Sequence, residues 1–180
     1  GNLQVDPFGP EHVKAYEVGL KSKWFDDRVL LNLSLFRSNY DDLQVTATTV
    51  NPETGLYAST TQNAATSRSQ GVELETDWAV SSIFRLSANV TYLDSKYRSY
   101  PDAPPTREQT INGVGAQDLS GARTEFAPEW SGSVVARLSV PLTAAYKLTT
   151  EVSPFYTSSY YNSGGSNDPL VGKVDSYTRV

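Results

Sequence analysis

The chain has 180 residues, 15 basic and 20 acidic side chains and a formal net charge of −5, and it contains neither cysteine nor methionine. The lack of cysteine excludes disulfides and thiolate metal or redox chemistry, and the acidic balance argues against nucleic acid as a partner. Only 38% of the residues are apolar, tyrosine included, so a large conventional core is not expected. No apolar run approaches the roughly 20 residues of a transmembrane helix, so any membrane crossing must use strands.

Apolar and polar side chains alternate with a period of two in the first part of the chain, which is the pattern of a strand with one apolar face. From Tyr16 to Trp24 the apolar side chains stand at even positions. A tight turn is predicted at 25–28, and the alternation that begins at Val29 continues in one phase through Val45. This second strand is far longer than the roughly 5–6 residues typical of soluble sheets.

The same period continues to the end of the chain, interrupted by loops and turns. Clusters of Pro, Gly, Asn and Ser mark the long connections. We expect, in order, a loop at 51–55, a strand reaching 78, a short turn near 79–81, a strand at 84–92, a loop from 98 to about 125, strands at 130–140 and 146–156 joined by 141–145, a loop at 162–169, and a last strand from 174.

Short and long connections therefore alternate along the whole chain. A soluble sandwich has no reason to make every second turn tight, whereas a bacterial outer-membrane barrel has short periplasmic turns and long extracellular loops. Trp24 and Trp78 lie beside short turns and Trp130 lies just inside a long loop, as expected for two interfacial aromatic belts. The sequence predicts an all-β fold, an antiparallel transmembrane β-barrel segment of about seven long strands with short periplasmic turns and long extracellular loops.

Such a segment is incomplete as a folding unit. About seven strands are too few to close even the smallest barrel of roughly eight, and an open sheet would leave unpaired edges in lipid. The first residues contain no basic segment followed by an apolar stretch, and the chain starts with glycine, not methionine. We therefore expect a mature segment or a piece cut from a longer protein.

Four groups of residues, in this order, resemble the barrel of TonB-dependent outer-membrane receptors. They are Phe8-Gly9-Pro10-Glu11 with Tyr16 to Lys21, Leu33 to Phe36 with Tyr40 to Val45, Asn63-Ala64-Ala65 with Gly71 to Glu75, and Leu119-Ser120-Gly121 with Ala127 to Trp130. The resemblance covers nearly the whole chain, from about Phe8 to Val180. It implies that residues 1–180 are a partial β-barrel domain from the later part of a larger receptor of about 22 strands, with the plug domain and final strands not present.

The resemblance also implies a function. Receptors of this family lie in the outer membrane of Gram-negative bacteria, bind a scarce nutrient, commonly a ferric siderophore and sometimes haem, cobalamin or a glycan, and import it with energy from the TonB complex. They are not enzymes, and no cofactor is expected. The segment that contacts TonB is not found in residues 1–180, and the last residue is Val180 where a complete barrel ends in an aromatic. The expected partners are outer-membrane lipid, a nutrient ligand and, through a plug region, the TonB complex.

Four residues of the longest loop are candidates for ligand binding: Tyr97, Arg98, Tyr100 and Arg107. They place aromatic rings and guanidinium groups near one another, which suits an anionic, aromatic ligand such as a ferric siderophore. The alternative is a Tyr-rich loop that does not contact ligand.

No catalytic or metal site is expected. His12 is the only histidine and stands alone before a strand, which is more typical of a solvated side chain than of a metal ligand. Glu73, Glu75 and Asp77 share one face of a strand and could suggest acid–base chemistry or a cation site, but a polar lumen wall explains them equally well.

Two other classes of protein stay open. A small structural or adhesive outer-membrane barrel would need an eighth strand ending in an aromatic soon after Val180. A soluble β-sandwich binding module would be soluble without detergent and would expose no apolar band.

The alternation further predicts which way the side chains face. The residues expected to face lipid are Val29, Leu31, Leu33, Leu35, Leu74, Leu86, Val134 and Leu138, and those expected to face the lumen are Asn32, Ser34, Glu73, Arg85 and Arg137. A turn centred on Val80 would also place Glu75 directly opposite Arg85, where the two would form an ion pair.

Overall fold

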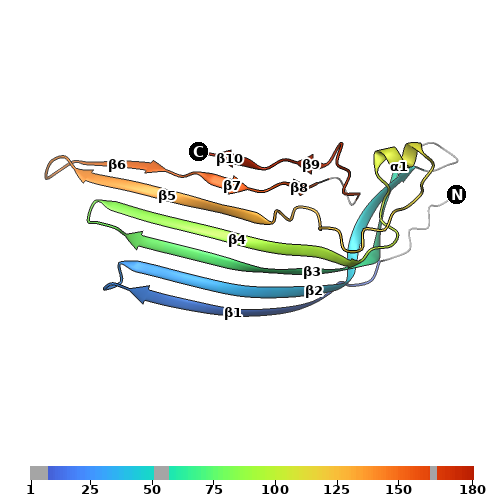
Figure 1. The fold of residues 1–180 in the computed structure, drawn as a ribbon, viewed down its shortest axis with the longest axis horizontal. Helices are drawn as coiled ribbons and strands as arrows, with labels where there is room; N and C mark the ends of the chain where they lie inside the picture. The colour runs from blue at the N-terminus through green and yellow to red at the C-terminus, as the bar shows by residue number, and fades with distance from the viewer. Residues whose placement is uncertain (1–7, 51–56, 163–165) are drawn as a thin grey trace.

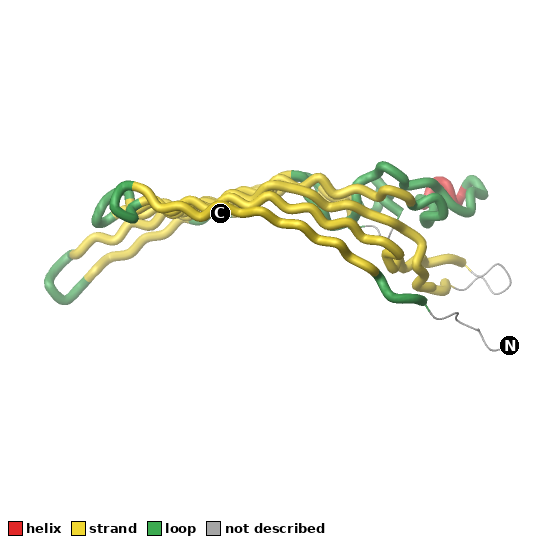
Figure 2. The backbone as a smooth tube through the Cα atoms, turned by 90° about the horizontal axis from the view of Figure 1, so that it is seen from below, coloured by secondary structure: helices red, strands yellow, loops and turns green. Residues whose placement is uncertain are grey.

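The alternating segments pair with one another into a single long antiparallel sheet. The structure is a computed structural model that describes residues 8–50, 57–162 and 166–180. Figure 1 shows the strands side by side, and Figure 2 shows that the sheet is curved along its length. The strands are β1 (His12–Trp24), β2 (Val29–Val50), β3 (Tyr57–Ala79), β4 (Phe84–Ser99), β5 (Trp130–Pro141), β6 (Lys147–Val152), β7 (Phe155–Thr157), β8 (Tyr160–Tyr161), β9 (Lys173–Val174) and β10 (Tyr177–Arg179), and the one helix of the described residues is α1 (Arg107–Ile111).

Strands that follow one another in the chain are neighbours in the sheet. The order is β1-β2-β3-β4-β5-β7-β10, with β6 also paired to β5 and with β8 and β9 in a small ladder of their own. The described strands thus form an open sheet with β1 at one edge and β10 at the other, which confirms the predicted antiparallel order. The predicted loop at 51–55 and positions 163–165 of the loop at 162–169 lie outside the described residues.

The last two predicted strands are divided into shorter pieces. The strand expected at 146–156 is interrupted between β6 and β7, where Pro154 has no N–H to donate to β5 but accepts the N–H of Val134 on its carbonyl at 3.0 Å. The strand expected from Val174 consists of β9, which pairs with β8, and β10, which pairs with β7.

The prediction of one continuous phase through β2 is wrong beyond Tyr40. The register between β2 and β3 shifts between Tyr40 and Leu43 and again between Leu43 and Gln44, and Asp42 has φ 56°. A bulge of this kind inserts unpaired residues, so the alternation restarts after it. Aspartate tolerates the left-handed backbone better than most residues, which is why it can occupy this position.

Helix α1 lies in the loop between β4 and β5 and is not predicted by the alternation. Thr106 caps it: the Thr106 hydroxyl accepts the N–H of Gln109, and the Gln109 side chain accepts the N–H of Thr106. A threonine followed three residues later by glutamine is a capping box, so the signal is present in the sequence.

The sheet has two chemically different faces. Cross-strand partners share a face, and the register places Leu33 opposite Leu74 and Leu74 opposite Val90 on one side, which we call the apolar face. On the other side, the polar face, Asn32 lies opposite Glu75. Every residue predicted above to face lipid falls on the apolar face, and every residue predicted to face the lumen falls on the polar face.

The predicted pairing of Glu75 with Arg85 is wrong. Glu75 lies opposite Asn89, and Arg85 lies opposite Ala79. The reason is a turn shifted by two residues: Ser81 closes it by accepting the N–H groups of Ile83 and Phe84 on its hydroxyl.

A shift by two residues keeps each side chain on its predicted face, because the period of a strand is two. The nearest acidic side chain to Arg85 on that face is instead Asp77, whose carboxylate lies 2.8 Å from the Arg85 Nε.

Aromatic residues lie at both ends of the apolar face. Trp24 and Trp78 are in the same cross-strand row beside the short turns, both flanking Val29. At the other end Trp130 lies opposite Tyr92, with ring centroids 4.9 Å apart. The tryptophans therefore occupy the positions that the sequence predicts.

Candidate functional site

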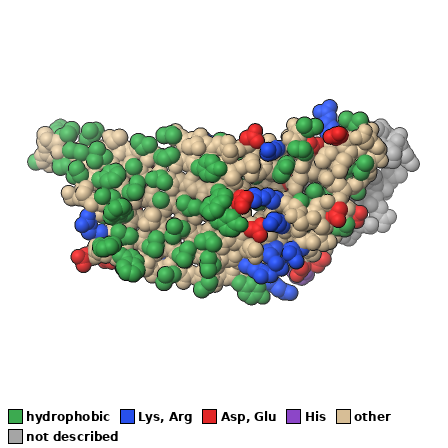
Figure 3. All heavy atoms as spheres, viewed as in Figure 1, with side chains coloured by type: hydrophobic (Ala, Val, Ile, Leu, Met, Phe, Trp, Pro, Cys, Tyr) green, Lys and Arg blue, Asp and Glu red, His purple; other side chains and the backbone are tan. Residues whose placement is uncertain are grey.

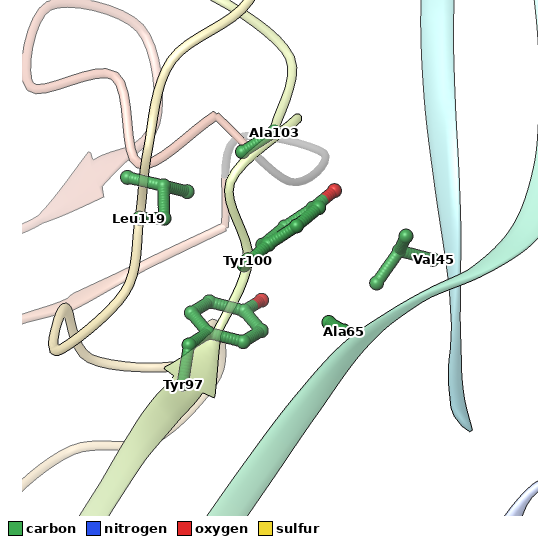
Figure 4. Packing of buried hydrophobic residues seen from close by; sticks show 6 residues of the cluster. All are labelled: Val45, Ala65, Tyr97, Tyr100, Ala103 and Leu119. Carbon is green, nitrogen blue, oxygen red and sulfur yellow. The ribbon is translucent and has the colours of Figure 1, made fainter. Parts of the chain in front are cut away.

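The long connection between β4 and β5 folds back over the polar face of β2 and β3. Its buried residues pack against the far ends of these two strands in a cluster that we call the loop cluster (Figure 4). The loop cluster comprises Val45, Ala65, Tyr97, Tyr100, Ala103 and Leu119. It is the main apolar cluster of the described residues, because the rest of the sheet exposes both of its faces.

Backbone hydrogen bonds hold the loop in this conformation. Leu119 donates its N–H to the Tyr100 carbonyl at 2.9 Å, and Ala103 and Gln117 exchange two bonds of 2.9 Å. The Gln117 side chain also donates to the carbonyls of Pro104 and Ser166 at 2.6 and 2.7 Å. The loop is therefore a folded unit with its own internal pairing, tied to the connection that follows β8.

Two tyrosines form the centre of the loop cluster. The side chains of Tyr97 and Tyr100 are 6% and 0% exposed, and their rings contact each other with centroids 5.0 Å apart. Burial, and next the nearby carboxylate of Glu125, raise the pKa of both phenols to about 12. In Figure 4 both hydroxyls point from the end of β4 toward the side where Val45 and Ala65 lie.

The Tyr100 hydroxyl has no hydrogen-bond partner among the described residues. A buried hydroxyl without a partner costs about 1–3 kcal/mol, so such a group is usually completed by a water or a ligand.

A hollow of about 480 Å³ lies beside this cluster on the polar face. Hydroxyl groups form one part of its wall: Ser95 Oγ lies 2.6 Å from Ser69 Oγ and 2.6 Å from Thr124 Oγ1, and Ser67 and Tyr97 add to the lining. Apolar side chains, Leu43, Val45 and Phe126, form another part. The carboxylate of Glu125 also borders the hollow. Such a wall can donate and accept several hydrogen bonds and therefore suits an oxygen-rich ligand.

The structure does not bring the four candidate residues together, and the prediction that all four lie in the loop is wrong, because Tyr97 and Arg98 belong to β4. Tyr97 and Tyr100 are in contact, whereas Arg98 is exposed and lies close enough to Arg68 to interact with it electrostatically. Arg107 is exposed at the start of α1. The sequence did not predict the hydroxyl wall, although Ser67, Ser69 and Ser95 stand at the polar positions of their strands.

The start of α1 is held by a buried carboxylate. Asp168 is 2% exposed and accepts the backbone N–H of Arg107 at 2.7 Å and that of Leu170 at 2.8 Å. The bond from the Arg107 N–H, followed by those from Leu170 and Val171, lowers the pKa of Asp168 against the opposing effect of its burial. This carboxylate therefore joins the β4–β5 loop to the segment before β9.

The acidic row predicted from the sequence is part of the polar face. Glu75 accepts a bond from the Asn32 side chain at 3.4 Å, and Asp77 binds Ser87 at 2.7 Å in addition to Arg85. His12 lies exposed at the start of β1. Among the described residues, no three acidic or histidine side chains gather as a metal site would require. Within those same ranges no helix is long and apolar enough to cross a membrane.

Comparison with known proteins places the sheet within a larger architecture. The family model for the β-barrel of TonB-dependent receptor-like proteins matches residues 1–180. Among solved structures, the ferric yersiniabactin uptake receptor FyuA from Yersinia pestis superposes with a TM-score of 0.67 at 19% identity, over 96% of this chain and 22% of that one. The siderophore receptor PiuA from Acinetobacter baumannii gives a TM-score of 0.66 at 21% identity, over 99% and 22% of the two chains.

A third structure, the ferric-catecholate import receptor Fiu from Escherichia coli K12, gives a TM-score of 0.59 at 18% identity, over 95% of this chain and 20% of that one. The chain thus spans only about a fifth of the length of these receptors. At such identities the likeness to solved structures shows the fold alone. None of these matches supports a small adhesive barrel or a soluble sandwich.

Proposed function

Because the chain belongs to the family of TonB-dependent receptor-like β-barrels, we propose that it forms one section of the barrel wall of an outer-membrane receptor that binds and imports a scarce nutrient. Proteins of this family are transporters, so the chain is not an enzyme. Residues 1–180 form a partial barrel domain in this proposal. In this proposal the import of the nutrient uses energy from the TonB complex, which acts through a plug region outside residues 1–180.

The proposed orientation puts the apolar face in lipid and the polar face in the lumen of the barrel. The exposure of apolar side chains supports it: Val18, Leu20 and Leu148 are all more than half exposed although they alternate with polar residues. In a soluble protein an apolar patch of this extent would have to be covered by another element. The short turns then lie on the periplasmic side and the loop cluster on the outer side of a Gram-negative outer membrane.

The single observation that carries ligand binding is the hydroxyl-lined hollow beside the buried tyrosines. It opens on the polar face at the loop end of the strands, where an incoming nutrient would enter the barrel. We propose that the nutrient is a ferric siderophore, whose oxygen-rich surface the hydroxyl wall would bind and whose negative charge Arg107 would attract from the loop. FyuA, PiuA and Fiu are each described as receptors for such compounds, which is consistent with this choice.

The candidate residues then have different roles. Tyr97 forms part of the wall of the site, and its hydroxyl would bind a ligand oxygen. Tyr100 is fully buried beside the Tyr97 ring and holds that ring in place. Arg107 attracts the ligand from the loop. Arg98 has no role in the site, because it alternates in phase with Lys96 and lies near Arg68 on the other side of the sheet.

The experiment measures uptake of radioactive iron by cells that express the full receptor as their one siderophore receptor. The probes are ferric complexes of one catecholate, one hydroxamate and one phenolate siderophore. Tyr97→Phe together with Arg107→Ala should lower uptake of the transported complex about tenfold or more at limiting concentration, from the loss of one neutral and one charged hydrogen bond.

Tyr146→Phe is the matched control, because Tyr146 is 72% exposed in the turn before β6 and should not affect uptake. Barrel assembly is checked by heat-dependent mobility on gels. Unchanged uptake of every transported complex in the double variant would remove these residues from the site, and failure to transport any of the three would overturn the siderophore assignment.

A further inference from the structure

A row of cationic side chains crosses the sheet just beyond the outer end of the apolar face. Lys14 lies opposite Asn39, Asn39 opposite Arg68, Arg68 opposite Lys96, and Lys96 opposite Arg123 of the β4–β5 loop. Four of these five consecutive cross-strand positions carry a positive charge. Arg37 stands in the adjacent row, opposite Tyr16. We call the five charged residues, Lys14, Arg37, Arg68, Lys96 and Arg123, the cationic belt.

The cationic belt is on the same side of the sheet as the apolar face. Lys14 alternates in phase with Tyr16 and Val18, which lie on that face, and cross-strand pairing carries the same orientation to the other strands. Figure 3 shows basic side chains gathered beyond one end of the apolar band, at the end of the molecule where the long loop lies. The aromatic pair Tyr92 and Trp130 ends the band directly beneath the belt.

The belt has more positive than negative charge, although the whole chain carries −5. Lys96 pairs with Asp94 at 2.8 Å, and Arg123 pairs with Glu129. Lys14, Arg37 and Arg68 have no ion pair among the described residues, and the Arg68 Nε donates to the neutral side chain of Asn39 at 3.0 Å.

The surrounding acidic groups do not neutralise these three cations. Asp41 stands one row further out, opposite His12, and Glu11 accepts the backbone N–H of Gln44. Arg37 and Arg98 both lie close enough to Arg68 for mutual repulsion. Like charges placed side by side destabilise a sheet. An anion that binds to these cations from outside would remove the repulsion.

An apolar groove begins directly inside the belt, on the same face. Gly132 lies between Val90 and Tyr156 in the sheet and has no side chain to fill the groove. A side chain is not accommodated at this position, because a Cβ would lie 2.5 Å from the Asn89 carbonyl oxygen. The groove has a volume of about 360 Å³, and its lining includes Trp130 and Val134. It is suited to a hydrocarbon chain that runs along the strands away from the belt.

We propose that the cationic belt binds the phosphate groups of an anionic glycolipid of the outer leaflet, with an acyl chain lying in the Gly132 groove. Arginine guanidinium groups bind phosphate through two parallel hydrogen bonds, and lysines add charge. Strands stand about 4.8 Å apart, so the row from Lys14 to Lys96 spans about 14 Å and accommodates a headgroup with more than one phosphate. The proposal rests on the proposed orientation of the barrel in the membrane, but not on the identity of the nutrient.

The test uses the full receptor in phosphatidylcholine nanodiscs, titrated with bis-phosphorylated lipid A, and counts the bound lipid by native mass spectrometry. Arg37→Gln with Arg68→Gln should weaken binding about thirtyfold, since each cation near an anionic headgroup contributes roughly 1 kcal/mol and a tenfold change is about 1.4 kcal/mol. The matched control is Lys21→Gln with Lys23→Gln, which removes the same charge from the polar face and should bind like the parent receptor.

Three further results decide the outcome. Dephosphorylated lipid A should bind at least tenfold more weakly than the bis-phosphorylated form, and inorganic phosphate should not displace the lipid, because the acyl chain is part of the contact. Val134→Phe, which adds a larger side chain inside the groove, should weaken binding without changing the preference for phosphate. Equal binding of the two lipids, or equal loss in both charge variants, would overturn the cationic belt as a lipid site. Ferric siderophore uptake, measured in the same variants, reports separately on the proposed function.

Discussion

Tyr97 and Tyr100 differ from the other tyrosines whose side chains the structure describes, because their phenol groups are buried beside a carboxylate. A phenol without an interaction ionises near 10, whereas these two have a pKa of about 12 in the folded protein. Below pH 10 the phenols are neutral in both the folded and the unfolded loop, so the stability of the loop cluster does not depend on pH there. Between about pH 10 and 12 only the unfolded loop ionises, so the stability falls as the pH rises.

We therefore expect the β4–β5 loop of the full receptor to become sensitive to an alkaline protease between pH 10 and 12, while the barrel remains assembled. Limited proteolysis at stepped pH, with cleavage sites identified by mass spectrometry, measures this. Tyr97→Phe with Tyr100→Phe should abolish the pH dependence, whereas the exposed control Tyr146→Phe should keep it. A loop equally resistant at pH 9 and pH 12 would show that the phenols do not govern its opening.

The four candidate residues also show what a sequence can and cannot predict about a site. Spacing predicts one loop for Tyr97, Arg98, Tyr100 and Arg107, whereas the first two lie at the end of β4. Spacing also does not show that the loop folds back and buries the two tyrosines. That outcome depends on packing against Val45 and Ala65, which are more than thirty residues earlier in the chain. The hydroxyl wall combines residues of β3, of β4 and of the loop at Thr124, so no local sequence pattern predicts it.

At the scale of the strands, alternation predicts the face of a side chain reliably and its partner poorly. Moving a turn by two residues changes every partner but leaves every face unchanged, which is what happened between β3 and β4. The position of that turn depends on which serine closes it, and Ser81 and Ser82 offer similar chemistry. The break at Pro154 and the bulge at Asp42 likewise depend on local backbone geometry that binary patterning does not contain.

The register of β3 and β4 can be tested directly, because the chain has no cysteine of its own. Glu75→Cys with Asn89→Cys should be joined efficiently by a short thiol cross-linker in the assembled receptor, since directly opposite Cβ atoms are about 4.5–5.5 Å apart. Glu75→Cys with Arg85→Cys should be joined poorly, because Arg85 lies opposite Ala79. Comparing the shift of the two variants on a denaturing gel measures this, and the reverse order of efficiency would restore the turn centred on Val80.

At the scale of the whole molecule, the separation of the two faces determines how the sheet meets its surroundings. Both faces are exposed along most strands, so only the chemistry of the side chains assigns one to lipid. The sequence is sufficient for this assignment because the register keeps the apolar rows continuous from β1 to β6. It is not sufficient for the shape of the loops, which depends on contacts between distant segments.

Single cysteines report on this assignment in the full receptor in its native membrane. Leu74→Cys and Leu86→Cys should react with a lipid-soluble maleimide, and Glu73→Cys and Arg85→Cys should react with a small water-soluble one. Each lipid-facing position is compared with the residue next to it in the chain: Leu74 with Glu73 and Leu86 with Arg85. The two residues of a pair therefore lie at nearly the same depth in the membrane. Labelling of positions 73 and 85 by the lipid-soluble reagent alone would reverse the faces of the barrel.

The loop cluster has a consequence for the time course of assembly. The strand ladders join segments that are close in the chain, whereas the loop cluster joins Val45 and Ala65 to Leu119 across two hairpins. Contacts between distant segments form late, since the intervening chain must be ordered first. While the hairpins are being inserted, the loop with its two tyrosines is open to periplasmic or surface proteases, and it closes only when β2 and β3 have reached their final places. In a pulse–chase experiment, the time for which the loop stays sensitive to protease would therefore measure how long this part of the barrel takes to complete its assembly.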